Sequence, residues 1–129
     1  MSAKSLLENF YNSDIANNEA LVNDFFHKDC ELHWNSSNGF TLLKYDDVIA
    51  FFEGVRSSYN SLRFSHTHLL ESGNFVTIRH HVYAQTIEQP NNEVLLAHFI
   101  SLLEVKDNKL YRCYELSQLA YKKQLILIK

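Results

Sequence analysis

The chain contains few of the residues that break or cross-link secondary structure: three glycines, one proline and two cysteines in 129 residues. So few glycines leave no glycine-rich phosphate loop, and we expect no cofactor. Cys30 and Cys113 form neither a disulfide framework nor a redox pair in the sequence. Their use as small apolar residues is typical of a reducing compartment, and the cytoplasm is the expected location.

Excess basic charge and long apolar runs are also absent. The 12 Lys and Arg residues are outnumbered by 15 Asp and Glu residues, and the formal net charge is −3. No stretch is strongly basic, so nucleic acid is not an expected partner. No apolar run reaches membrane-spanning length, and the segment MSAKSLLENFYNSD lacks the pattern of a secretory signal. We therefore expect no membrane partner.

Hydrophobic residues make up 46% of the chain and aromatic residues 13%, which predicts a substantial core. The length indicates one domain over residues 1–129, able to bury about two-thirds of the surface that the unfolded chain exposes.

Apolar periodicity predicts helices grouped at the beginning of the chain and strands at its end. Two helices are expected before residue 29, the first with capping-box spacing at Ser5 and Glu8, and a third over 45–60. Alternation predicts strands over 30–35, 40–43, 61–70, 75–87, 93–105 and 110–119. The tail QLILIK could add a strand or pack on a partner. This order indicates an α+β domain with a pocket between curved sheet and helices.

Four segments resemble the nuclear transport factor 2-like superfamily, including its SnoaL-like and ketosteroid isomerase-like families. They are FFHKDCELHW, YDDVIAFFEGV, ESGNFVTIRHHV and LLEVKDNKLYRCYEL. The resemblance depends on their order and spacing along nearly the whole chain. Two departures are Asn108, where glycine is usual in the last turn, and the absence of a glycine before the third helix.

The resemblance implies a cone-shaped, cystatin-like fold: three helices packed on a strongly curved antiparallel or mixed sheet around a pocket for small, mostly apolar molecules. Aligned with the isomerases, Trp34 falls at the catalytic aspartate, Phe10 near the oxyanion-hole tyrosine and Ser101 near the protonated carboxylic acid. Trp and Phe cannot replace a base and a hydroxyl donor, so ketosteroid isomerase activity is not expected. The alignment also turns Cys30 and Leu32 toward the pocket.

The stretch FSHTHLLESGNFVTIRHH, residues 64–81, holds four of the seven histidines. Alternation predicts that His80 faces inward and His81 outward. A three-residue turn at 72–74 would turn His66 and His68 inward, and a two-residue turn would turn both outward. Apolar matching favours the longer turn. The three inward histidines could then bind zinc or iron, or serve only as structural hydrogen-bonding groups.

Glu115 is the second candidate for chemistry. The isomerase alignment turns it inward with Tyr111, Cys113 and Ser117, whereas hydrophobicity prefers the opposite face of that strand. If it faces inward, His80 and Glu115 could form a catalytic or a purely structural pair. The expected pocket lining is Cys30, Leu32, Trp34, Phe52, His66, His68, Ile78, Val82, Phe99 and Ser101.

The leading hypothesis is a pocket protein that binds a small, largely apolar organic molecule, with acid–base isomerase, cyclase or dehydratase chemistry. A binding-only protein and an interaction module with a filled pocket are the alternatives; a histidine-ligated metal site ranks lower. Apolar residues expected on the outer sheet face predict a homodimer. They are Ile100, Leu102, Tyr114 and Leu116, beside His98.

Overall fold

The computed structural model describes residues 2–120, so the tail segment QLILIK lies outside the described residues. The elements are α1 (Ala3–Tyr11), α2 (Ala20–Phe25), β1 (Phe26–Ser36), β2 (Gly39–Lys44), α3 (Tyr45–Ser58), β3 (Tyr59–Ser72), β4 (Phe75–Thr86), β5 (Glu93–Lys106) and β6 (Lys109–Leu119). This order confirms the predicted α+β class. Within residues 2–120, no helix has the length and apolar character needed to cross a membrane.

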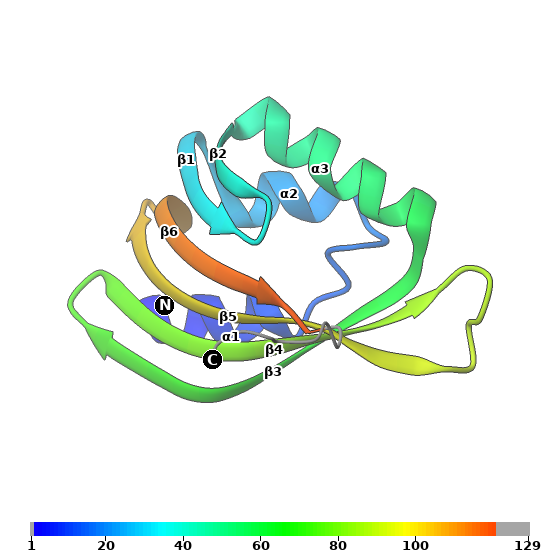
Figure 1. The fold of residues 1–129 in the computed structure, drawn as a ribbon. Coiled ribbons are helices and arrows are strands. Elements are labelled where there is room, and N and C mark those ends of the chain that lie inside the picture. The colour runs from blue at the N-terminus through cyan, green and yellow to red at the C-terminus, as the bar shows by residue number, and fades with distance from the viewer. Residues whose placement is uncertain (1, 121–129) are drawn as a thin grey trace.

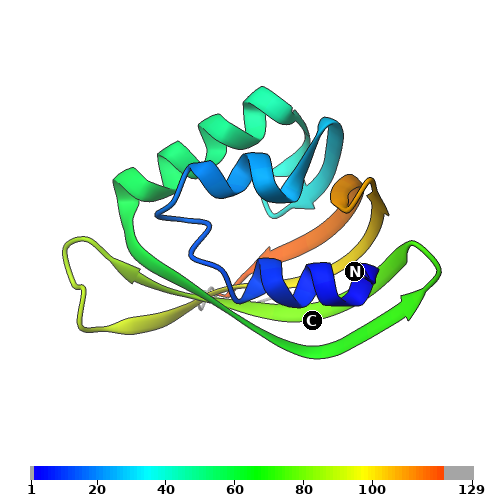
Figure 2. The same cartoon turned by 180° about the vertical axis from the view of Figure 1, so that it is seen from behind.

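The six strands form one mixed sheet in the order β2-β1-β6-β5-β4-β3. The β1–β6 pair is parallel, and the remaining neighbours are antiparallel. Figures 1 and 2 show the sheet curling strongly, with α2 and α3 across its open side and α1 along β3 and β4. The helices and the concave sheet face therefore enclose the interior of a cone.

Helix α1 begins three residues earlier than its capping-box spacing suggests. The Ser2 side chain is the N-cap and accepts a hydrogen bond from the Ser5 backbone N–H. The apolar stripe of the helix then faces the sheet, where Leu6, Leu7 and Phe10 are buried and Leu7 is 0% exposed.

The β3–β4 hairpin has a two-residue turn at Gly73 and Asn74, since Ser72 pairs with Phe75. Gly73 has a φ of 59°, a backbone conformation that glycine adopts without strain. Near the turn, the two-residue alternative is therefore correct, and the exposed His68 lies opposite the exposed Arg79.

The register of this hairpin changes between His66 and His68. Thr67 is the extra residue of a β-bulge, which reverses the alternation of side chains beyond it. His66 consequently lies opposite His80, as the three-residue alternative predicts. Each alternative describes one half of the hairpin, because both assumed an uninterrupted strand.

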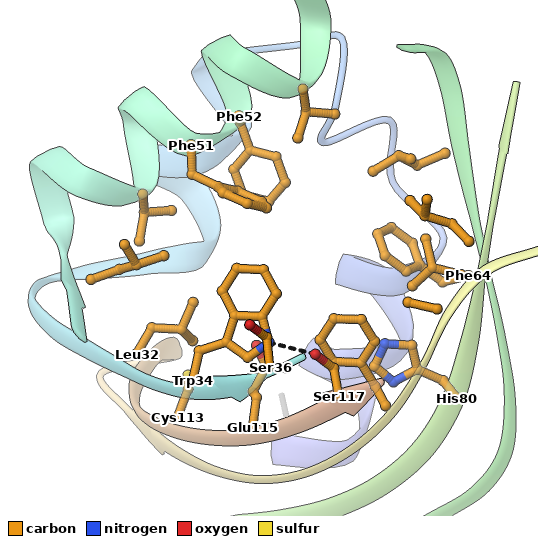
Figure 3. A pocket seen from close by; sticks show the side chains of 18 of the residues that line it. Leu32, Trp34, Ser36, Phe51, Phe52, Phe64, His80, Cys113, Glu115 and Ser117 are labelled. Atoms are coloured by element: carbon orange, nitrogen blue, oxygen red, sulfur yellow. Dashed lines mark hydrogen bonds between the residues drawn. The ribbon is translucent and has the colours of Figure 1, made fainter. Parts of the chain in front are cut away.

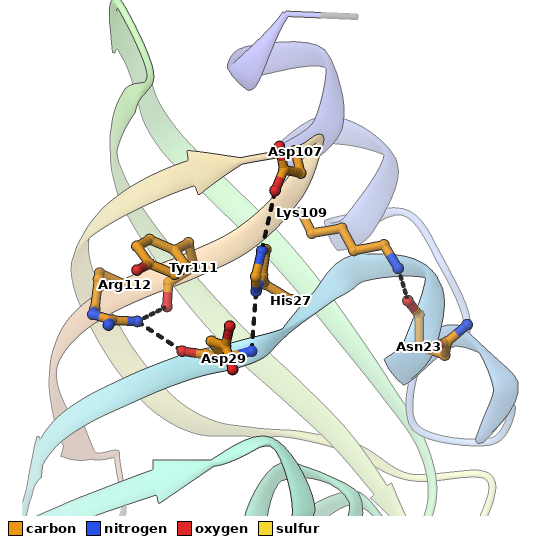
Figure 4. Close-up of polar contacts among 7 residues, drawn as sticks. All are labelled: Asn23, His27, Asp29, Asp107, Lys109, Tyr111 and Arg112. Atoms are coloured by element: carbon orange, nitrogen blue, oxygen red, sulfur yellow. Dashed lines mark hydrogen bonds and ion pairs between the residues drawn. The ribbon is translucent and has the colours of Figure 1, made fainter.

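Tyr111, near the start of β6, lies outside the cone, although the isomerase alignment turned it inward. Its ring packs against that of His27 with centroids 5.0 Å apart, and the Arg112 guanidinium lies 4.0 Å from the Tyr111 centroid. Figure 4 shows this surface group, in which Arg112 also donates to the carbonyl of Asp29 at 2.7 Å. Leu110 faces inward instead and is 2% exposed.

The β5–β6 turn explains how the chain replaces the usual glycine. Asp107 and Asn108 have φ angles of 56° and 59°, and Lys106 pairs with Lys109 across them. Positive φ at both central residues defines a type I′ hairpin turn, and Asn and Asp tolerate this conformation better than other residues with a side chain.

Replacing Asn108 by Val should lower the free energy of unfolding by about 1–2 kcal/mol, because a β-branched residue is strained at positive φ. Asn108→Gly is the matched control and should keep or slightly raise stability. Urea unfolding of the two variants checks this, and equal midpoints would contradict the turn assignment.

Candidate functional site

A cavity of about 300 Å³ lies between the helices and the concave face of the sheet. Its wall is mostly hydrocarbon, and α1, β1, α3, β4, β5 and β6 all contribute side chains. The aromatic part includes Phe10, Tyr11, Trp34, Phe51, Phe52 and Phe99. Figure 3 shows Phe51 and Phe52 of α3 facing Trp34, His80, Glu115 and Ser117 across the cavity.

Strand alternation places the side chains of the sheet wall. Leu32 and Trp34 enter from β1, where Glu31 and His33 take the other face. Cys113, Glu115 and Ser117 enter from β6. The isomerase alignment thus agrees with the structure for these three residues. Hydrophobicity misleads for β6, because its polar residues face a cavity and its apolar residues face outward.

Trp34 forms part of the cavity wall, and one hydrogen bond and two ring contacts fix its side chain. Its Nε1–H donates to the Ser117 hydroxyl at 2.8 Å. Its ring stacks on Phe99 with centroids 6.1 Å apart and meets Phe51 edge-on at 5.5 Å. These contacts fix an apolar surface in this part of the cavity wall.

Glu115 is the carboxylic acid of the cavity. Ser101 donates a hydrogen bond from its hydroxyl to Oε2 of Glu115 at 2.9 Å. Burial among apolar side chains raises the pKa of Glu115 to about 7, and the Ser101 hydrogen bond only partly opposes this rise. A carboxyl group of this kind gains and loses its proton near neutral pH.

His80 is the imidazole of the cavity and is 2% exposed. Its ring stacks on that of Phe99, with centroids 4.9 Å apart and planes 9° from parallel. The centroid of the Tyr11 ring lies 4.8 Å from that of His80, and the two planes are inclined at 49°. Burial lowers the pKa of His80 to about 4, assisted by His81 and His66. His80 is therefore neutral at pH 7, and within the described structure its buried Nδ1 has no hydrogen-bond partner.

His80 and Glu115 are not a hydrogen-bonded pair, which corrects the sequence-based hypothesis. His80 lies opposite Phe99, whereas Glu115 lies opposite Ser101 on the far side of β5. Two strand spacings and a shift of two residues place their Cα atoms roughly 12 Å apart. The two groups line one cavity from separate positions.

The remaining expected pocket residues divide into those that line the cavity and those that do not. Phe52, Val82 and Phe99 line the cavity with Leu32 and Trp34, but Cys30, Ile78 and Ser101 are buried in the sheet without forming its wall. His66 and His68 are exposed and do not line the cavity either. The convergence of His66, His68 and His80 that the three-residue turn implied is therefore wrong, because the register shift places His68 opposite Arg79. Among residues 2–120, no three potential ligands gather as a metal site.

Tyr11 is a polar cavity residue that the expected pocket lining did not include. The alignment assigned the relevant position to Phe10, yet both neighbouring side chains line the cavity from the last turn of α1. Burial raises the pKa of Tyr11, followed by the nearby Glu115 and Cys113, so its hydroxyl keeps its proton. The two consecutive aromatic residues Phe10 and Tyr11 were the feature of the sequence that could have indicated it.

The chain belongs to the SnoaL-like domain family, whose model matches residues 7–113. A comparison with curated protein sequences finds no match. The fold is that of the nuclear transport factor 2-like proteins, as the resemblance implied.

Several solved structures are similar to this fold. IdmH, a proposed polyketide cyclase from Streptomyces antibioticus, has a TM-score of 0.73 at 8% identity, covering 91% of this chain and 92% of IdmH. AusH from Aspergillus nidulans has a TM-score of 0.76 at 11% identity, covering 94% and 86%. AclR, a proposed hydroxylase from Streptomyces galilaeus, has a TM-score of 0.68 at 16% identity, covering 88% and 73%.

The Glu115 pKa predicts a pH dependence of stability. Between its ordinary pKa of 4.5 and about 7, the folded protein keeps a proton that the unfolded chain has lost, so rising pH removes stability. Glu115→Gln abolishes this effect. Relative to wild type, the variant should gain up to about 3 kcal/mol of unfolding free energy between pH 4.5 and 7.

His80→Asn is the opposing control for the same measurement. Since its folded pKa is lowered from 6.5 to about 4, His80 stabilises the protein above pH 6.5, and this stability is lost as pH falls toward 4. The His80 variant should therefore lose stability relative to wild type as pH rises from 4 to 6.5. Urea unfolding at several pH values measures both, and parallel profiles for all three proteins would contradict the two assignments.

Proposed function

We propose that the cavity binds a small, largely apolar organic molecule and that Glu115 transfers a proton to or from it. The observation that carries this proposal is one carboxyl group enclosed by hydrocarbon and aromatic rings, with open volume beside it. A cavity of about 300 Å³ is at the lower end of small-molecule sites, which predicts a compact ligand of one or two rings.

Proton transfer at carbon fits the groups that face the cavity. An ionised Glu115 would remove a proton from a carbon next to a carbonyl group, and the protonated form would return it elsewhere. This step is common to isomerase, cyclase and dehydratase chemistry. His80 is neutral and offers one N–H donor and one nitrogen acceptor, so it would orient a polar group of the ligand.

The alternatives depend on what the cavity contains. An interaction module with a filled cone is disfavoured, because about 300 Å³ is open. A binding-only protein would use the same cavity and the same polar groups. Its distinguishing property is that a change of protonation at Glu115 would alter affinity without accelerating any bond change.

Deuterium exchange separates these functions. In D₂O at pH 7, wild-type protein should accelerate deuterium incorporation next to the carbonyl of a compact apolar ketone such as 1-tetralone or 2-indanone, followed by NMR. Glu115→Gln should reduce this acceleration by about 100- to 10,000-fold, the usual contribution of a general base.

Two variants serve as controls for the exchange experiment. Val82→Trp, which fills the cavity while leaving Glu115 in place, should abolish exchange and ligand binding together. His68→Ala, on the exposed part of β3, should change neither. Binding that persists in wild type without any exchange would support the binding-only function and contradict proton transfer.

We also propose that the outer sheet face forms a homodimer. Four large apolar side chains form a patch there, through the cross-strand pairs Ile100–Leu116 and Leu102–Tyr114. Ile100 is 49% and Leu116 58% exposed in the single chain. A second copy would remove this patch from water.

Leu116→Lys should convert the dimer to a monomer, because it places a charge in the centre of the buried patch. Leu70→Lys is the control: Leu70 is also exposed, on edge strand β3 outside the patch, and should leave the dimer intact. Light scattering at micromolar concentration measures both, and a monomeric wild-type protein would contradict the proposal.

A further inference from the structure

The outer face of the sheet carries a second pair of histidines, separate from the cavity. His81 of β4 and His98 of β5 lie directly opposite each other. Their Nδ1 atoms are 2.8 Å apart, and the rings meet edge-on with centroids at 4.9 Å. In the single chain His81 is half-buried and His98 exposed, so solvent reaches the pair, which lies beside the proposed dimer patch, two residues along β5 from Ile100.

We propose that His81 and His98 chelate one divalent transition-metal ion, such as Cu²⁺, Ni²⁺ or Zn²⁺, through their Nδ1 atoms. The distance of 2.8 Å between the two Nδ1 atoms is the observation that supports this proposal. Two imidazole nitrogens bound at about 2.0–2.1 Å lie roughly 2.9–3.4 Å apart for bond angles between 90° and tetrahedral. The observed pair therefore needs to separate by only a few tenths of an ångström to accept the ion.

The protonation of the pair is compatible with this ligand. At an Nδ1–Nδ1 distance of 2.8 Å, one ring donates its N–H and the other accepts, so the neutral rings are opposite tautomers. On binding, the donor ring loses its proton at Nδ1 and gains one at Nε2 through solvent. Both rings then present a free Nδ1, and no proton is released overall.

The surroundings keep His81 in the form that binds metal. Partial burial, His98 and Arg79 lower the pKa of His81, so its ring is neutral at pH 7. The guanidinium of Arg79 donates to the hydroxyl of Thr67 on β3 at 2.9 Å.

The site would be open rather than closed. Among residues 2–120, no group of three His, Cys, Asp or Glu side chains surrounds a metal position, so solvent takes the remaining coordination positions. Such a two-histidine site favours Cu²⁺ and Ni²⁺, whose tetragonal geometry matches cis ligands near 90°. It lies across the sheet from Glu115 and is independent of the function proposed for the cavity.

Calorimetric titration of tag-free protein with Cu²⁺ alone at pH 7.5 tests this site. Wild type should bind one ion per chain, and His81→Ala and His98→Ala should each weaken binding by about tenfold or more. His68→Ala, which removes another exposed histidine of the sheet, should bind as wild type does. Circular dichroism establishes that the variants are folded.

Electron paramagnetic resonance of the wild-type Cu²⁺ complex gives a second test that needs no variant. Hyperfine splitting from two imidazole nitrogens is expected. Equal affinity in wild type and His98→Ala, or a spectrum with a single imidazole nitrogen, would overturn the proposal.

Discussion

The carboxyl group of Glu115 lies on a wall made mainly of hydrocarbon. A hydrogen bond from the Ser101 hydroxyl only partly replaces the water that the carboxyl group loses there. Three features maintain this arrangement. The curvature of the sheet leaves a cavity between its concave face and α3, and the parallel β1–β6 pair sets Trp34 beside Glu115. A hydrogen bond to Ser117 and stacking on Phe99 then fix the Trp34 ring. The raised pKa, the open volume and the proposed chemistry all depend on this low-polarity enclosure.

The same enclosure explains the difference between the histidines of one hairpin. His80 and His81 are consecutive, yet alternation places the first inside the cone and the second on the outer face. His80 stays neutral because burial opposes its charge. His81 meets His98 instead, a partner from another hairpin. The four histidines are thus one cavity residue, His80, one outer-face residue paired with His98, and two exposed residues, rather than one cluster.

Much of this could be predicted from the sequence, because strands and helices leave strong periodic patterns. Element order, the inward face of β4 and the orientations of Leu32, Trp34 and Glu115 followed from alternation and from the family resemblance. The bulge at Thr67 could not be predicted, since one extra residue leaves no distinct compositional signal. Hydrophobicity failed on β6 for a physical reason: it assumes that the inner face of a strand is the apolar one, whereas Glu115 and Ser117 face the cavity and Tyr114 and Leu116 face outward.

The most direct test of the account is the protonation of Glu115 itself. In protein labelled with ¹³C at the glutamate carboxyl carbons, the Glu115 resonance, assigned by comparison with Glu115→Gln, should titrate with a midpoint near pH 7. A compact apolar ligand should raise that midpoint further, because it removes remaining water from the cavity. A midpoint near 4.5, the ordinary value for glutamate, would contradict the enclosure of the carboxyl group and the proton transfer proposed for it.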